Sequence, residues 1–445
     1  MSPIGMNISG MKSLLRALRS RNYRLFMAGQ SVSLVGTWMQ QVAMSWLVYR
    51  LTGSAFLLGV VGFTSQIPTL LFAPVAGVLA DRWDRRRLLI FTQALAMVQA
   101  GLLAAVVLSG IVQVWHIVLL SLLLGVVNAF DIPIRQSFLV EMVTYREDLG
   151  NAIALNSSMV NGARLIGPTI AGLLVASVGE GVCFILNSVS YLAVLVALVA
   201  MRIEPRPPDP TKRRHVFHEL REGFAYAVGF GPIRSILMLV ALVSLTGMPY
   251  TVLVPVFAKE VLHGGVHTFG FLMTAGGCGA FAGTVYLASR KSVLGLGRLI
   301  ARAAILFAAG IAAFALSSNL FISMVSLAVA GFGAITLIAS SNTILQTILE
   351  EDKRGRVMSF FTVAFIGIAP FGSLGAGTMA GVIGPRETLL LGAGCCLMGA
   401  ALFARHLPQV REMVRPIYIK MGIIKEVAHG METAAEQPPF PGAQE

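Results

Sequence analysis

The chain has 445 residues, of which 56% are hydrophobic and only 12% are charged, and its formal net charge is +13. A soluble domain could not bury this much apolar surface, so the composition excludes a soluble globular protein and indicates a polytopic membrane protein. The positive charge does not point to nucleic acid, because no basic stretch is interleaved with exposed aromatic residues in a foldable soluble module.

Twelve stretches are long and apolar enough to cross a bilayer, since about 20 apolar residues span roughly 30 Å of hydrocarbon. We predict helical spans at 23–49, 54–80, 88–109, 114–138, 152–176, 181–201, 233–258, 268–289, 299–318, 320–348, 357–383 and 387–406. If the N-terminus is cytoplasmic, the Lys and Arg residues outside the spans lie almost entirely on the cytoplasmic side of the membrane. Only Arg50, Lys259 and Arg386 lie in the outer loops. A basic excess in short loops marks the cytoplasmic side, so both termini are expected to be cytoplasmic. Removing any one span would place later basic loops outside.

The longest polar interruption, residues 202–232, divides the spans into two equal groups. The first span carries Ser-Leu-Val-Gly at 33–36, and the seventh carries Ser-Leu-Thr-Gly at 244–247 in the same register. This similarity predicts two parallel six-helix bundles, with a substrate site at their interface near mid-membrane. The predicted organisation is a cytoplasmic segment at 1–22, bundles at 23–201 and 233–406 joined by a cytoplasmic linker at 202–232, and a cytoplasmic tail at 407–445.

The loop between the second and third spans packs acidic and basic residues into a tight turn. From 77 to 87 it reads GVLADRWDRRR. Gly77 allows the second helix to approach a neighbour closely, and Asp81 can accept from arginines or cap the positive end of an opposing helix. We interpret this loop as a cytoplasmic latch, formed by Gly77, Asp81, Arg82, Arg85 and Arg86. The alternative interpretation is a basic loop that only sets the orientation of the chain.

This loop resembles the signature of the major facilitator superfamily, Gly-x-x-x-Asp-Arg-x-Gly-Arg-Arg, with Asp84 where the family usually has Gly. The fifth span resembles the Gly-Pro motif of the exporter branch, although Ala171 replaces one glycine. The matching residues are Gly162, Gly167, Pro168 and Gly172. The resemblance covers roughly residues 20 to 405 and is to bacterial drug and proton antiporters, including the enterobactin exporter and macrolide efflux proteins. It implies an all-helical fold of two pseudo-symmetric bundles, export across the bacterial inner membrane, and protons as the coupling ion.

Charged residues clearly inside the predicted spans are scarce: they are Asp131, Arg135 and Arg164. Counted from the cytoplasmic ends at 1.5 Å per residue, Asp131 lies roughly 10 to 13 Å deep and Arg164 roughly 18 Å. An isolated ion is so costly there that pairing or contact with water is close to obligatory, and we expect Asp131 to be shared between the two arginines. One hypothesis is that Asp131 gains and loses a proton while Arg164 meets an anionic part of the substrate. The alternative is a permanent charge network that holds the inner gate closed.

Polar and aromatic residues at matching depths of several spans are candidates for the lining of a substrate cavity. They are Trp38, Gln41, Phe63, Gln66, Tyr250, Asn342, Gln346, Phe361 and Phe365. The mixture of aromatic faces with a few amides favours a small amphipathic substrate, because a sugar would need more polar groups and a peptide or phosphate more charge. For each aromatic residue, packing against lipid or another helix is the alternative.

Other classes of function fit the sequence less well. An ATP-driven pump is opposed by the absence of a Gly-Lys-Ser/Thr phosphate loop, and an enzyme by the absence of catalytic clusters within the spans. The four cysteines lack metal-ligand spacing, so neither a metal nor a cofactor is expected. We therefore predict a monomeric secondary transporter that exports a drug-like or siderophore-like compound in exchange for protons. Apart from the substrate and the protons, membrane lipids are its expected partners. A lysophospholipid flippase of the same superfamily remains an alternative, since that substrate is also amphipathic.

The tail after 406 carries an amphipathic basic piece from Val410 to Val427. Such a helix is expected to lie along the inner leaflet, where its basic face meets anionic headgroups. A Pro-rich end follows it.

Overall fold

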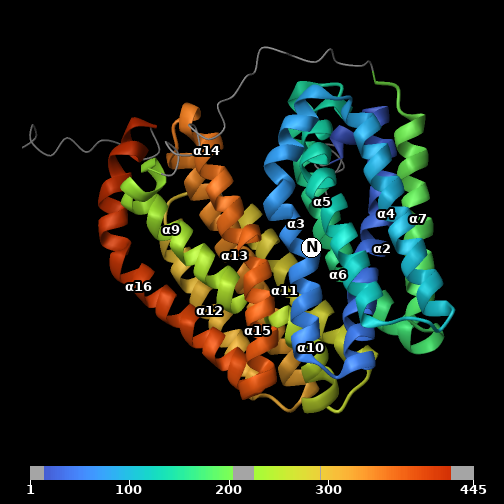
Figure 1. The fold of residues 1–445 in the computed structure, drawn as a ribbon. Coiled ribbons are helices and arrows are strands. Elements are labelled where there is room, and N and C mark those ends of the chain that lie inside the picture. The colour runs from blue at the N-terminus through green and yellow to red at the C-terminus, as the bar shows by residue number, and fades with distance from the viewer. Residues whose placement is uncertain (1–14, 204–224, 291, 422–445) are drawn as a thin grey trace, which may run out of the picture.

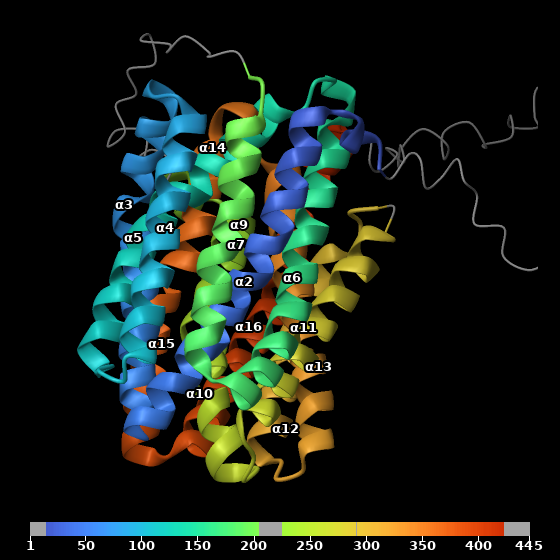
Figure 2. The same ribbon diagram turned by 90° about the vertical axis from the view of Figure 1, so that its right-hand side faces the viewer.

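The computed structural model describes residues 15–203, 225–290 and 292–421, apart from the side chains of residues 73, 74, 77, 78, 80–82, 351 and 352. Within these residues the chain is almost entirely helical, and the long helices run side by side in two groups (Figures 1 and 2). We call these groups the first half and the second half.

The first half consists of six long helices, α2 (Arg21–Thr52), α3 (Ala55–Arg82), α4 (Arg85–Leu108), α5 (Val114–Met142), α6 (Leu149–Val178) and α7 (Glu180–Ala200), with the short turns η1 (Arg16–Arg19) and η2 (Arg146–Asp148). The second half consists of α9 (Gly231–Leu242), η3 (Val243–Gly247), α10 (Tyr250–Val256), η4 (Phe257–Val261), α11 (Val266–Ala288), α12 (Leu296–Leu316), α13 (Leu320–Ile348), α14 (Glu351–Thr362), η5 (Val363–Gly367), α15 (Ala369–Ile383) and α16 (Pro385–Lys420). The two sets occupy separate sides of the molecule (Figure 1).

Eleven helical stretches of the described chain are long and apolar enough to cross a membrane, and they correspond to every predicted span except the first. The exception, α2, is 32 residues long, but Gln30, Ser33 and Gln40 lower its hydropathy. These polar side chains are buried against other helices, since α2 packs against both α6 and α7. The twelfth spanning helix is therefore identified by its packing rather than by its hydropathy.

The repeated Ser-Leu-x-Gly sequences occupy equivalent positions in the two halves. A side chain at Gly36 of α2 would overlap Asn187 of α7, and one at Gly247 of η3 would overlap Phe307 and Cys396 of α12 and α16. In each half, the glycine thus lets the first helix approach the last one closely. The similarity seen in the sequence reflects a shared packing requirement.

Two helical stretches of the second half contain π-helical turns. The turn η3 lies just before Pro249, and the turn η5 lies just before Pro370. A proline removes a backbone donor and pushes against the preceding turn, which accounts for a local irregularity at both places. Helix breaks of this kind commonly mark functional segments of membrane transporters.

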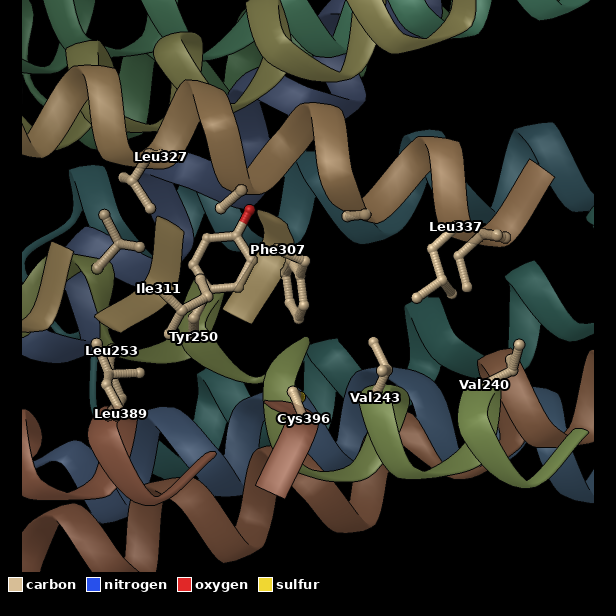
Figure 3. Close-up of a cluster of buried hydrophobic side chains, with 14 of the residues drawn as sticks. Val240, Val243, Tyr250, Leu253, Phe307, Ile311, Leu327, Leu337, Leu389 and Cys396 are labelled. Atoms are coloured by element: carbon tan, nitrogen blue, oxygen red, sulfur yellow. The ribbon is translucent and has the colours of Figure 1, made fainter. Parts of the chain in front are cut away.

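One apolar cluster extends through both halves, and its larger part lies in the second half, where α9, η3 and α10 pack against α12, α13 and α16 (Figure 3). Its members include Val240, Val243, Tyr250, Leu253, Phe307, Ile311, Leu327, Leu337, Leu389 and Cys396. Glycines allow the neighbouring helices to come closer still, because a side chain at Gly331 of α13 would overlap the backbone of Gly276 in α11. These side chains pack the helices of the second half together, and the same cluster continues into the first half.

The last helix is longer than predicted. α16 continues beyond residue 406 to Lys420, and Leu407, Val410 and Val414 are buried on it. Met413 packs beside Gly231 at the start of α9. The predicted amphipathic piece is therefore continuous with the last spanning helix as far as Lys420, and part of its apolar face packs on the bundle; its position along the inner leaflet stays a prediction. Residues 422–427 of the predicted piece lie outside the described residues.

Candidate functional site

The two halves meet along two pairs of long helices. α3 lies against α15, and α6 lies against α11. We call the end of the bundle where α2 begins and α16 finishes the basic end, and the opposite end the far end. The ribbons of α3 and α15 adjoin near the far end and diverge toward the basic end (Figure 1).

Backbone contacts join the halves toward the far end. A Cβ atom at Gly59 of α3 would lie 2.7 Å from the carbonyl oxygen of Ser373 in α15, and one at Gly172 of α6 would lie 3.2 Å from the Cα atom of Gly270 in α11. Small residues permit this approach, which no larger side chain would allow. Trp46 of α2 also stacks on Phe269 of α11 at 6.2 Å between ring centroids. The halves are therefore closed against each other at this end.

A polar contact across the halves accompanies this closure. The hydroxyl of Tyr49 in α2 donates a hydrogen bond to the carboxylate of Glu260 in η4. The ammonium of Lys259 lies 5.4 Å from the centroid of the Tyr49 ring, within range of a cation–π contact. We did not predict this group from the sequence. Its signal was a pair of charged residues at the far end of the seventh span, where loops carry few charges.

Polar side chains are exposed on the basic-end portions of several spanning helices. They are Ser157 and Ser158 on α6, Gln346 on α13, and Ser359 and Thr362 on α14. The serines and the threonine each donate to a carbonyl oxygen of their own helix, and Gln346 donates to Asn342.

A small pocket lies where the two halves meet, between these exposed positions and the closed far end. Its lining residues are Trp38 of α2, Arg164 and Pro168 of α6, Tyr250 and Thr251 of α10, and Leu272, Met273, Gly276 and Gly277 of α11. The guanidinium of Arg164 lies 5.5 Å from the centroid of the Trp38 ring. Tyr250 is buried and packs edge-on against Phe307, so its ring is held in place by the second half.

The pocket contains only two of the predicted cavity residues, Trp38 and Tyr250. The others do not line it. Gln41 is exposed on α2, Gln66 donates to the carbonyl of Gly62, and Gln346 donates to Asn342. Of the aromatic residues, Phe63 packs edge-on against Phe371 of α15, Phe361 is buried in the apolar cluster, and Phe365 is half-buried beside it. Residues at similar depth can face different neighbours, because depth does not fix the rotation of a helix about its axis. The sequence did not indicate Leu272 or Met273 as lining residues.

Asp131 is almost completely buried, with 3% of its surface exposed, but it does not lie in this pocket. Thr92 Oγ1 and Gln93 Nε2 donate to one carboxylate oxygen at 2.9 and 2.7 Å, and Arg135 Nε lies 3.5 Å from the other. The expected pair with Arg135 is therefore present, whereas Arg164 makes no contact with Asp131 in the described chain. The polar residues of α4 supply the donors that we had assigned to Arg164. Their signal in the sequence was a Thr-Gln pair inside an apolar span.

The predicted latch is described only in part, because the side chains of Gly77, Asp81 and Arg82 lie outside the described residues. Arg85 Nη1 pairs with Glu141 of α5 at 2.7 Å. Arg86 donates to the carbonyl oxygens of Leu198 and Val199 at 2.7 and 2.8 Å, which places a cation on the negative C-terminal end of α7. The described arginines thus join helices of the first half.

Asp84, which replaces the usual glycine of the motif, caps the N-terminus of α4. Its side chain accepts a hydrogen bond from the backbone N–H of Arg87 at 2.9 Å. We expect Asp84→Ala to lower the free energy of unfolding by about 1 kcal/mol, because the N–H loses its partner. Asp84→Asn preserves an acceptor and should keep the stability. The thermal unfolding of the purified variants in detergent would measure the difference, and equal midpoints for both variants would contradict this role.

The segment before α2 binds the loop that precedes α6. Asp148 is fully buried and accepts from Arg16 Nε and Arg19 Nε, both at 2.6 Å, while Arg19 also pairs with Glu147 at 2.7 Å. The hydrogen bonds to Glu147 and Asp148 raise the pKa of Arg19. Sequence reasoning had treated these arginines only as orientation signals. They also tie the start of the first helix to the start of the fifth.

The residues of the fifth-span motif have different surroundings. A Cβ atom at Gly167 would lie 2.5 Å from the Cβ atom of Trp38, so this glycine allows α6 to cross α2. Pro168 is buried at the pocket, and Gly172 makes the close contact with α11 described above. No atom lies within 4 Å of a Cβ atom placed on Gly162. Three of the four motif residues therefore lie at the pocket or at the helix contacts beside it. The fourth, Gly162, has open space at its Cβ position.

Residues 12–417 match a protein family described as transmembrane secretion effector. The chain is 26% identical over 369 residues to the staphyloferrin A transporter of Staphylococcus aureus, which covers 82% of this chain and 91% of that protein. It is 23% identical over 399 residues to macrolide efflux protein A of Streptococcus pyogenes, covering 87% and 96%. It is also 26% identical over 400 residues to the multidrug efflux pump Tap of Mycobacterium tuberculosis, covering 87% and 91%. These relatives are transporters rather than enzymes.

Solved transporter structures share the fold. A bacterial homolog of the human lysosomal transporter Spinster, in an inward-facing and unoccupied conformation, superposes with a TM-score of 0.64 at 16% identity and covers 89% of this chain and 98% of that chain. A POT family transporter in complex with 5-aminolevulinic acid superposes with a TM-score of 0.70 at 9% identity, covering 88% and 97%. At such identities the likeness concerns the fold alone. It confirms the predicted all-helical membrane fold.

Proposed function

Since the chain belongs to the transmembrane secretion effector family, within the efflux transporters of the major facilitator superfamily, we propose that it exports a small amphipathic compound in exchange for protons. In this proposal the protein acts as a monomer in the bacterial inner membrane, and its basic end, with both termini, faces the cytoplasm. The compound is drug-like or siderophore-like, and it moves by alternating access between the two halves.

The observation that carries this proposal is the pocket between the halves. It is lined by α2 and α6 from one half and by α10 and α11 from the other, so a compound in it contacts both. The halves are closed on the far side of this pocket by Gly59, Gly172 and Tyr49. A relative rotation of the two halves would open the far end and close the basic end around the same pocket, as alternating access requires.

The lining supports an amphipathic substrate. Trp38, Leu272 and Met273 offer apolar surface, while Arg164 and Thr251 offer polar groups. Binding sites for small molecules commonly combine a mainly apolar wall with a few polar groups that fix orientation. A strongly hydrophilic compound would leave the apolar wall uncovered.

The test is drug accumulation in bacterial cells that lack or overproduce the protein, with cells carrying the empty vector as control. We expect overproducing cells to accumulate less of an exported compound, such as a macrolide or an amphipathic dye, and a protonophore to remove the difference. A difference that survives the protonophore would contradict proton coupling. Unchanged drug accumulation, together with movement of a fluorescent lysophospholipid in vesicles, would support the flippase alternative instead.

A further inference from the structure

We propose that the pocket is a carboxylate site: Arg164 binds the carboxylate of a singly charged organic anion, and the apolar body of that anion lies against Trp38 and Tyr250. This inference rests on the proposed transport function and names the chemical class of the substrate. It would distinguish the protein from exporters that select lipophilic cations.

The first step concerns the charge of Arg164. In the part of the chain that the structure describes, its guanidinium makes no ion pair, and it lies 5.5 Å from the centroid of the Trp38 ring. The side chain is half-buried, at a depth where an isolated ion is costly. A cation held there without an anion is an incomplete pair, and the ring of Trp38 offsets only a small part of its desolvation.

The second step compares Arg164 with the other embedded charges. Asp131 and Arg135 face each other within the first half, and Thr92 and Gln93 complete the shell of donors around the carboxylate. That group is satisfied by the protein itself. Arg164 differs because the open side of its guanidinium lies at the pocket between the halves, where a ligand can reach it.

The third step concerns the choice of anion. Arg164 is the only charged residue among the pocket-lining residues, which are all described. A guanidinium pairs with a carboxylate through two parallel hydrogen bonds, and one positive charge balances one carboxylate. A phosphate monoester carries nearly two charges and would leave one of them uncompensated in this apolar surrounding. The geometry therefore favours a carboxylate.

The fourth step concerns the body of the ligand. Leu272, Met273 and the ring of Tyr250 provide apolar wall, and Gly277 lets this part of α11 pack close to the backbone of Arg164. An aromatic or aliphatic body would lie against this wall once its carboxylate is at Arg164, and the halves would have to move apart to admit it, because the pocket between them is narrow. A ligand cation would be repelled by the same arginine, so the site discriminates by charge as well as by shape.

The experiment measures equilibrium binding to the purified full-length protein in lipid nanodiscs. The probes are three pairs, each of a carboxylic acid and its methyl ester: a rhodamine with a free carboxylate, naphthylacetic acid and dodecanoic acid. We expect the protein to bind the acid of at least one pair about tenfold or more tightly than the ester, since a hydrogen-bonded charge pair contributes that much. Arg164→Gln should remove this preference, and Arg164→Lys should retain part of it.

Arg302→Gln is the matched control, because Arg302 is exposed on α12 and does not line the pocket. It should keep the native preference for the acid. Thermal unfolding of each variant shows whether it is folded, and the acid-to-ester ratio of the native protein is informative even if Arg164→Gln is unstable. The inference is overturned if the native protein prefers no acid over its ester, or if Arg164→Gln keeps the preference.

This experiment is independent of the direction and the energy source of transport. Binding is measured without a gradient, so a protein that fails the accumulation test with the protonophore can still show the preference for acids. Conversely, a protein that exports drugs but binds acids and esters equally would contradict the carboxylate site and leave the proposed function in place.

Discussion

Replacement of Gly172 by valine is expected to reduce export by about fivefold or more. A Cβ atom on this residue would already lie 3.2 Å from the Cα atom of Gly270 and 3.4 Å from the carbonyl oxygen of Val266. The two methyl groups of valine would have to enter the space occupied by the α11 backbone, and overpacking of this kind costs about 1–3 kcal/mol. Since 1.4 kcal/mol changes an equilibrium constant tenfold, the ratio of the far-end-closed state to the far-end-open state would fall about fivefold or more.

Gly162→Val is the matched control for this substitution. Gly162 lies on the same helix and in the same motif, but no atom lies within 4 Å of its Cβ position. We expect its export to stay close to that of the native protein. Drug accumulation in cells, normalised to the amount of protein in the membrane, would measure both variants. Native export by a well-expressed Gly172→Val protein would show that the close contact between α6 and α11 is not needed.

The fold could be predicted from the sequence because two strong physical signals agree. Spanning a bilayer requires long apolar stretches, and the basic loops fix their alternation. The end of α16 was missed because Leu407, Val410 and Val414 continue an apolar stripe into a basic segment, and the sequence does not tell whether such a stripe packs on lipid or on α9. Packing partners decide this, and hydropathy does not record them.

The candidate site could be predicted only in part. Arg164 and Asp131 were recognisable because ionisable residues inside a membrane are rare. Their partners were not, because the rotation of each helix decides whether Arg164 faces Asp131 or Trp38. The contact between Tyr49 and Glu260 was missed for a different reason: it joins residues 211 positions apart, and only the closure of the two halves brings them together.

Asp131→Asn is expected to abolish transport in every mode, including downhill exchange of substrate, and to lower the thermal stability. The carboxylate accepts hydrogen bonds from Thr92 and Gln93 and faces Arg135. The NH₂ group of an asparagine is itself a donor, so it could not accept a hydrogen bond from whichever of these groups it faced. Leaving Arg135 without its anion costs about 1–3 kcal/mol, because it remains in a largely apolar surrounding. Export in cells, exchange in proteoliposomes and unfolding in detergent are the three measurements.

The double variant Asp131→Asn with Arg135→Gln serves as the control. If Asp131 holds the first half together, removal of both charges should restore part of the stability and part of the exchange, because no unpaired ion is left. If Asp131 instead carries the proton, exchange should survive in Asp131→Asn while uphill export is lost. The second outcome would contradict the structural role expected here.

The expectation of a structural role follows from where the partners lie. A proton carrier must change its surroundings as the halves rotate, so that it releases its proton on the other side of the membrane. Thr92, Gln93 and Arg135 belong to the same half as Asp131, and a rigid rotation of that half leaves all of these contacts unchanged. Glu260 differs, since its donor Tyr49 is on the opposite half and departs when the far end opens. Glu260→Gln should therefore lose uphill export and keep exchange, whereas Asp131→Asn is expected to lose both.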